Sequence, residues 1–148
     1  MEAVIFIGIQ GSGKSSFYLA RFYRTHIRIN LDMLRTRHRE QLLLSACVEG
    51  KSRFVVDNTN PTITERARYI TPARAAGFQI VGYYFRASLA CALRRNNLRP
   101  ENERVPEKGI IGTHRRLQLP SLAEGLDALY YVTIDELTGS FTIEEWQG

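Results

Sequence analysis

The chain has 148 residues, the length of about one domain with a hydrophobic core of its own. Its two cysteines are too few for a disulfide framework, and no apolar run is long enough to span a membrane. We therefore expect a cytoplasmic protein with reduced thiols, no signal peptide and no membrane contact. The net charge is +5, and 17 of the 20 basic residues are arginine, which favours bidentate binding of an anionic ligand.

Strand patterns and helix patterns alternate along the chain, and no linker or repeat interrupts them. The predicted strands are 3–7, 26–30, 53–57, 79–85 and 128–134, and the predicted helices are 14–24, 32–48, 62–76, 88–98 and 121–127. The segment 141–146 adds a possible edge strand. Short connections between alternating elements predict an α/β fold, a mostly parallel sheet of about five strands with helices on both faces. We expect residues 1–148 to form one domain.

The first strand runs into the sequence IFIGIQGSGKSS (5–16), which fits the P-loop pattern G-x-x-x-x-G-K-[ST]. Glycines allow positive φ and let backbone N–H groups approach an anion, and the following helix adds its positive dipole end. Lys14 is placed to reach the β- and γ-phosphates of a nucleotide, and the Ser15 hydroxyl to bind Mg²⁺. A plain glycine-rich turn is the alternative, but strand, loop and amphipathic helix follow in the order that a nucleotide-phosphate site requires.

Two later segments carry signals that shape the predicted helices. Thr62 and Glu65 fit a capping box at the start of the 62–76 helix, whereas Pro72 should kink or split it. The segment 99–120 is rich in helix breakers, which predict one long irregular stretch. Long irregular stretches in compact domains are often functional lids, and we expect a lid over about residues 94–118. Those breakers are Pro100, Pro106, Gly109, Gly112 and Pro120.

Polar residues follow the second strand in the sequence RINLDMLR. Asp32 begins the predicted helix and Arg35 lies one turn later, so both side chains should face one cleft at the carboxyl edge of the sheet. The carboxylate could accept the proton of an attacking hydroxyl, and the arginine could hold an anionic group of the acceptor. The alternative is an N-cap aspartate with a surface ion pair.

The third strand ends in VVDNTNP, where Asp57 takes the position of a Walker-B-like carboxylate that supports Mg²⁺. The alternative is a turn in which Asn60 caps the next helix and Pro61 opens it. Both interpretations can hold together.

The helix 88–98 ends in LRRNNLR, which places Arg95 and Arg99 four residues apart on one face. Arginines on a mobile segment can close over the phosphates and stabilise the charge of a phosphoryl-transfer transition state. An ordinary solvated basic face is the alternative.

The motifs GIQGSGKSS, INLDMLR, VVDNTNP and RRNNLR, in this order and spacing, resemble those of the polynucleotide 5′-hydroxyl kinase family. The likeness is greatest to the kinase module of polynucleotide kinase/phosphatase end-repair enzymes, within the P-loop kinase superfamily. The stretches RARYITPARAAG (66–77) and LPSLAEGLDALYYV (119–132) extend it over nearly the whole chain.

On the donor side, the resemblance implies ATP as the phosphate donor, with Mg²⁺. Lys14 and the loop amides would hold the ATP phosphates, and Ser15 would hold the Mg²⁺. Arg99, together with Arg95, would contact the ATP phosphates from the lid. The residues expected to contact ATP are Gly8, Gln10, Gly11, Ser12, Gly13, Lys14, Ser15, Ser16, Arg95 and Arg99.

On the acceptor side, the resemblance implies the 5′-hydroxyl ends of DNA or RNA, in nucleic acid repair. Asp32 would be the general base and Arg35 would hold the phosphate next to the hydroxyl. Asp57 and Asn58 match a turn of which either residue would orient acceptor or metal. The catalytic set is then Lys14, Asp32, Arg35 and Arg99. The acid-phosphatase aspartate motif of the end-repair enzymes does not occur, so we expect no 3′-phosphatase activity.

Two other functions fit a P-loop. One is a kinase of a small metabolite or nucleotide, which would share the fold, the lid and the aspartate–arginine pair. The other is a non-catalytic NTP-binding module, which would tolerate loss of Asp32 and the lid arginines. The arginines at 35, 37, 39 and 53 favour a polyanionic acceptor.

Overall fold

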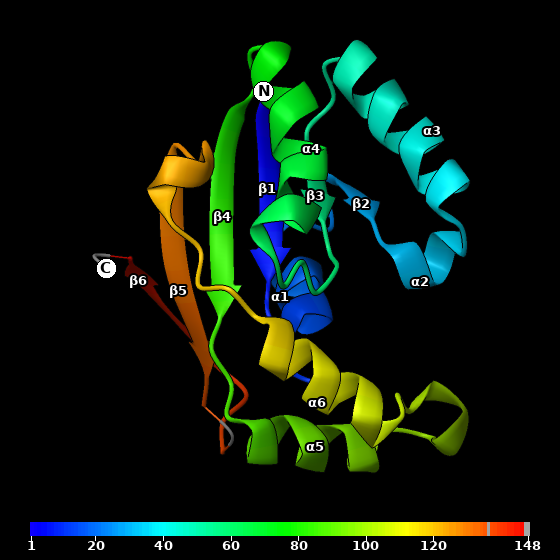
Figure 1. Cartoon of the computed structure of the whole chain (residues 1–148). Coiled ribbons are helices and arrows are strands. Elements are labelled where there is room, and N and C mark those ends of the chain that lie inside the picture. The colour runs from blue at the N-terminus through cyan, green and yellow to red at the C-terminus, as the bar shows by residue number, and fades with distance from the viewer. Residues whose placement is uncertain (136, 147–148) are drawn as a thin grey trace.

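The computed structural model describes residues 1–135 and 137–146, and its centre is a six-stranded sheet with the order β2-β3-β1-β4-β5-β6 (Figure 1). The strands are β1 (Glu2–Ile7), β2 (Ile27–Ile29), β3 (Phe54–Val56), β4 (Gln79–Phe85), β5 (Ala128–Ile134) and β6 (Phe141–Glu145). The first five strands run parallel, and β6 is antiparallel to β5. The predicted α/β fold with a mostly parallel sheet is thus confirmed, including the edge strand.

Strand β1 lies in the middle of the sheet, where Ile5 is aligned with Val56 of β3 and with Gly82 of β4. Successive side chains of a strand point to opposite faces. Ile5 accordingly packs in a core with Leu44 and Tyr69, whereas Phe6 packs on the other face with Phe17. Both faces of β1 are therefore covered, which explains its uninterrupted apolar run.

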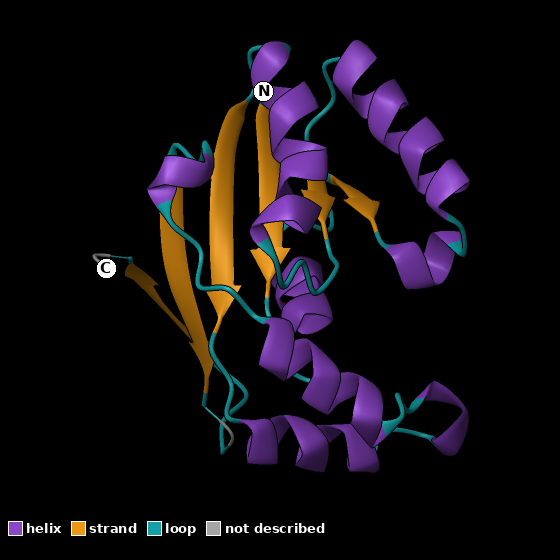
Figure 2. Ribbon diagram, viewed as in Figure 1, coloured by secondary structure: helices purple, strands orange, loops and turns teal. Residues whose placement is uncertain are grey.

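The helices form the outer layers (Figure 2). They are α1 (Lys14–Arg21), α2 (Leu31–Leu34), α3 (Arg37–Glu49), α4 (Ile63–Ala75), α5 (Leu89–Leu98) and α6 (Glu107–Arg116). Helices α5 and α6 lie beyond the carboxyl ends of β1 and β4 (Figure 1). In α/β sheets this edge is where ligands bind. Within the described residues, no helix has both the length and the apolarity to cross a membrane.

Two helix predictions are corrected by the structure. The helix expected at 32–48 is broken, because α2 ends at Leu34 and Arg35 has φ 78°, outside helical conformation. Of the kink or split expected at Pro72, the split does not occur, because α4 continues through Pro72 to Ala75. Pro72 lies in the last turn of α4, where its missing N–H removes only one helical hydrogen bond.

The prediction of an irregular stretch at 99–120 is wrong for much of that segment, because residues 107–116 form α6. Ile110 of α6 is fully buried against Ile9 and Ala92, and this packing outweighs the two glycines in the helix. The Asn96 side chain bonds both the N–H and the C=O of Val105, which ties α5 to the start of α6. The stretch predicted as a lid thus forms a helical hairpin, and the helix expected at 121–127 is only a short 3₁₀ turn at Leu122–Glu124.

Candidate active site

The phosphate loop between β1 and α1 has the backbone that its glycines predict. Gly11 and Gly13 have φ values of 77° and 98°, which L-residues with a side chain rarely adopt. A Cβ on Gly13 would lie 2.0 Å from Ile134 Cδ1, and one on Gly11 would lie 2.7 Å from the Ala92 carbonyl oxygen. The loop therefore fits closely between β5 and α5 and needs glycine at both positions.

Lys14 holds its ammonium group inside this loop. Its Nζ donates to the carbonyl oxygens of Gly8 (2.9 Å) and Ile9 (2.7 Å) and to Ser12 Oγ (3.3 Å). Burial lowers the pKa of Lys14 to about 8, although the nearby Asp57 carboxylate partly opposes this shift. The cation is thus fixed in position where a bound triphosphate would meet it.

This pKa predicts how ATP affinity depends on pH. Above a pKa of about 8 the free protein loses the Lys14 proton, whereas the triphosphate of bound ATP would retain it to higher pH. Binding in the window between those two pKa values should therefore take up a proton, and affinity should fall as pH rises through it. Calorimetric titration of ATP in buffers of different ionisation enthalpy measures the uptake. Lys14→Met should abolish it, and equal uptake by both proteins would contradict the assignment.

Ser15 and Asp57 lie together beside the loop, as the metal prediction requires. Ser15 Oγ donates to Asp57 Oδ2 at 3.1 Å, and the Asp57 side chain is only 1% exposed. Mg²⁺ prefers oxygen ligands and usually shares its coordination between one or two protein groups and substrate phosphates. The donor set fits that ion. Arg28 of β2 also contacts both residues, and sequence reasoning missed it.

A cleft of about 290 Å³ opens over the loop at the carboxyl edge of the sheet. It is lined by ten residues predicted for the site: Gln10, Gly11, Gly13, Lys14, Ser15, Ser16, Asp32, Asp57, Asn58 and Arg99. The remaining lining residues are Asn30, Leu31, Arg37, Thr59, Asn60, Glu65 and Val105. The cleft thus combines three cationic with three acidic side chains, which suits phosphate groups, a metal ion and a proton acceptor.

Asp32 lies in the first turn of α2 but does not cap it. The cap is Asn30, whose Oδ1 accepts from Met33 N–H at 2.9 Å and whose Nδ2 donates to the Asp57 carbonyl at 2.6 Å. Asn58 Oδ1 accepts from Leu31 N–H at 2.9 Å. The start of α2 is therefore attached to the end of β3 from two sides. Asp32 is left facing the cleft, and the interpretation of Asp32 as an N-cap is excluded.

Arg37 and Arg99 line the cleft together with Asp32, whereas Arg35 is not among the lining residues. Arg35 and Asp32 do not share a helix face, because α2 ends before Arg35. Arg37 Nη1 donates to Glu40 Oε1 (2.8 Å) and to Tyr69 Oη (3.0 Å). Glu40 is 1% exposed and also accepts from Asn58 Nδ2 at 3.0 Å. The Glu40 carboxylate and the Tyr69 hydroxyl therefore hold the guanidinium of Arg37 at the cleft.

A second pocket of about 570 Å³ adjoins the loop on the side of α5. Arg99 lines both pockets, whereas Arg95 lines only this one and donates to the Gly11 carbonyl at 3.3 Å. Leu98 and Phe141 give the pocket apolar walls. Gln10 of the loop donates to Thr113 of α6 at 3.1 Å, so α5 and α6 both contact the loop. The expected placement of the two arginines next to the loop is thus observed.

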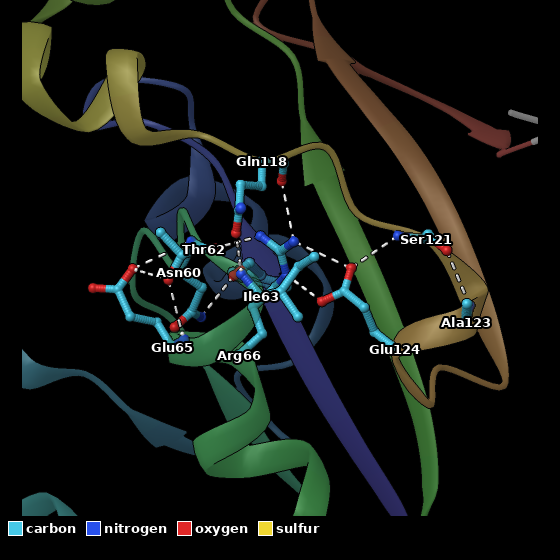
Figure 3. A network of polar contacts seen from close by, with 10 residues as sticks. Asn60, Thr62, Ile63, Glu65, Arg66, Gln118, Ser121, Ala123 and Glu124 are labelled. Carbon is cyan, nitrogen blue, oxygen red and sulfur yellow. Dashed lines mark hydrogen bonds and ion pairs between the residues drawn. The ribbon is translucent and has the colours of Figure 1, made fainter.

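A buried ion pair supports the turn between β3 and α4 (Figure 3). Arg66 is fully buried and bonds both carboxylate oxygens of Glu124, at 2.7 and 3.1 Å. It also donates to the carbonyls of Asn60 (2.9 Å) and Gln118 (3.1 Å). The cap of α4 is Thr62 with its predicted capping box, so the interpretation of Asn60 as the cap is wrong. Asn60 instead has φ 46° and donates to the Phe6 carbonyl at 2.8 Å.

Comparison with known proteins indicates the family to which the chain belongs. Residues 4–120 match the profile of the AAA domain family (AAA_33). The bifunctional polynucleotide phosphatase/kinase of Schizosaccharomyces pombe is 27% identical over 128 residues, which are 84% of this chain and 31% of that protein. The chain therefore spans less than a third of the length of that relative.

Two solved structures share the fold at low sequence identity. The gluconokinase of Sinorhizobium meliloti 1021 has a TM-score of 0.61 and 19% identity, over 89% of this chain and 82% of that one. Kti12 of Chaetomium thermophilum, solved in complex with ADP-AlF3, has a TM-score of 0.67 and 14% identity, over 91% and 92%. The match over residues 4–120 includes the phosphate loop, Asp32, Asp57, Arg95 and Arg99, and the chain belongs to the AAA domain family.

Proposed function

We propose that this protein is an ATP-dependent polynucleotide 5′-hydroxyl kinase, which transfers the γ-phosphate of ATP to the 5′-OH end of DNA or RNA. The observation that carries the proposal is that Lys14, Asp32 and Arg37 line one cleft. A phosphate-binding cation, a proton acceptor and an anion-binding arginine are the groups that such a transfer needs. The likeness to the polynucleotide phosphatase/kinase of S. pombe supports the choice of acceptor.

On the donor side, the phosphates of ATP lie along the loop and contact Lys14. Ser15 and Asp57 would hold Mg²⁺, which would supply positive charge to the phosphate groups during the transfer. The nucleoside lies in the second pocket, between α5 and the end of β5. Arg99 lines both pockets, so it lies where donor and acceptor meet and stabilises charge on the transferred group.

On the acceptor side, Asp32 accepts the proton of the 5′-hydroxyl as the hydroxyl oxygen attacks phosphorus. Arg37 replaces Arg35 as the residue that binds the acceptor's neighbouring phosphate. Its guanidinium is already oriented by Glu40 and Tyr69, so little conformational entropy is lost when phosphate binds.

The proposal predicts a strong preference for an acceptor that carries a phosphate next to the reacting nucleoside. A nucleoside 3′-monophosphate should have a much higher kcat/KM than the free nucleoside, because the free nucleoside offers no anionic group to the Arg37 guanidinium. Steady-state kinetics with both acceptors measure the ratio. Arg37→Gln should reduce the ratio toward one.

Arg35→Gln is the matched control. It removes the same charge only two residues from Arg37, but the side chain of Arg35 does not line the cleft. It should leave the ratio close to that of the unmodified protein. Equal rates on the nucleoside and its 3′-monophosphate would instead favour a kinase of a small metabolite.

A further inference from the structure

Arg28 of β2 contacts the two oxygen atoms that fit Mg²⁺. Its Nε donates to Asp57 Oδ2 at 2.9 Å, and its Nη2 lies 2.9 Å from the same oxygen. The Nη2 also donates to Ser15 Oγ at 3.1 Å, and Ser15 Oγ donates in turn to Asp57 Oδ2. One guanidinium therefore binds both protein ligands from which the metal site would be built.

The two partners of this ion pair differ in their freedom to move. The Asp57 side chain is 1% exposed, whereas the Arg28 side chain is 27% exposed. The Arg28 guanidinium also lies over the ring of Tyr18, 5.7 Å from its centroid. Arg28 can thus turn toward solvent, while the carboxylate stays in place.

The charges around Asp57 decide when that movement is favourable. Lys14 lies close enough to Asp57 for the carboxylate to raise its pKa, so two protein cations face this one anion. A free divalent cation meets a site that is already neutralised by protein groups. The phosphates of ATP add several negative charges and reverse this balance.

We propose that Arg28 is a counter-ion that keeps Mg²⁺ off Ser15 and Asp57 until nucleotide binds, so that the metal enters together with ATP. Arg28 leaves the two oxygens when the ATP phosphates arrive with their metal. The proposal rests on the proposed use of Mg-ATP and is independent of the acceptor.

The first test compares metal binding without nucleotide in the unmodified protein and in Arg28→Gln. Mn²⁺ serves as the probe, and free Mn²⁺ is measured by electron paramagnetic resonance. Arg28→Gln should bind Mn²⁺ at least about ten-fold more tightly, because the competing cation is gone. Mg²⁺ alone should raise the unfolding midpoint of Arg28→Gln and leave that of the unmodified protein unchanged. Equal Mn²⁺ affinities, or an equal response of both midpoints to Mg²⁺, would overturn the proposal.

Two variants show whether the effect belongs to this site. Arg21→Gln removes one positive charge from α1, where the guanidinium lies over the Phe17 ring, and should behave as the unmodified protein does. Adding Asp57→Asn to Arg28→Gln should abolish the gain in Mn²⁺ affinity. A gain that persists in the double variant would show that the metal binds elsewhere and that Arg28 does not guard Asp57.

A measurement on the unmodified protein covers the case in which Arg28→Gln fails to fold. The NMR signal of the Arg28 Nε–H group can be identified by its loss in Arg28→Lys. Its chemical shift should change when the Mg²⁺ complex of a non-hydrolysable ATP analogue is added. Mg²⁺ alone should leave it unchanged, and a full shift with Mg²⁺ alone would contradict the proposal. If the Mg²⁺–nucleotide complex does not bind, the proposed kinase function fails, whereas the Mn²⁺ comparison still decides the role of Arg28.

Discussion

Asp32→Asn is expected to lower kcat for transfer to a 5′-hydroxyl by about 10²–10⁴, the range for loss of a positioned general base. The amide keeps the size of the side chain but cannot accept the proton. Asp32 lies on the cleft wall formed by α2, and its helix is capped by Asn30, so the change removes no cap. Steady-state kinetics and a calorimetric titration of Mg-ATP would show a loss of kcat with nearly unchanged ATP affinity.

Lys14→Ala serves as the contrasting variant, because Lys14 would contact the donor phosphates. It should weaken ATP binding and transfer together. Normal turnover by Asp32→Asn would contradict the role of Asp32 as general base and would show that it is only a polar residue that lines the cleft.

Arg66→Met is expected to lower the free energy of unfolding by about 3–5 kcal/mol, the range found when one partner of a buried ion pair is removed. Arg66 is 0% exposed and Glu124 is left buried without its partner, since the Glu124 side chain is only 6% exposed. The variant also loses the bonds to the Asn60 and Gln118 carbonyls, which tie α4 to the turn after β3 and to the end of the lid. Denaturant unfolding followed by circular dichroism measures the change.

Arg74→Met is the matched control on the same helix. Its guanidinium lies 4.0 Å from Asp127 with 59% of the side chain exposed, and such pairs contribute at most about 1 kcal/mol. A loss of stability no larger in Arg66→Met than in Arg74→Met would contradict the structural role given to the buried pair.

The sequence predicted the features that depend on local chemistry. The positive φ of Gly11 and Gly13 and the capping box at Thr62 follow from residue types at fixed spacing. The apolar runs and their alternation with helices were sufficient to predict a parallel sheet, because buried strands need cover on both faces. Ser15 and Asp57 were placed together because both follow strands at the same edge of the sheet.

The features that the sequence did not predict depend on contacts between distant segments. Arg28 reaches Asp57 because β2 pairs with β3, and alternation alone does not determine strand order. The sequence did not distinguish Arg37 from the arginines at 35, 39 and 53. The orientation of its side chain depends on Glu40 and Tyr69, which lie on two different helices. Helix α6 was missed because its two glycines and the prolines that flank it outweighed Ile110, whose burial becomes evident only once α5 packs beside it.

The most direct test of the proposed function follows the γ-phosphate itself. The full chain is incubated with Mg²⁺ and ATP labelled in the γ-phosphate, and with DNA and RNA oligonucleotides, nucleosides and gluconate as competing acceptors. We expect label on oligonucleotides with a 5′-hydroxyl and none on the same oligonucleotides that already carry a 5′-phosphate. Label on gluconate or nucleosides in preference to the oligonucleotides, or release of inorganic phosphate alone, would contradict the assignment of a polynucleotide 5′-hydroxyl kinase.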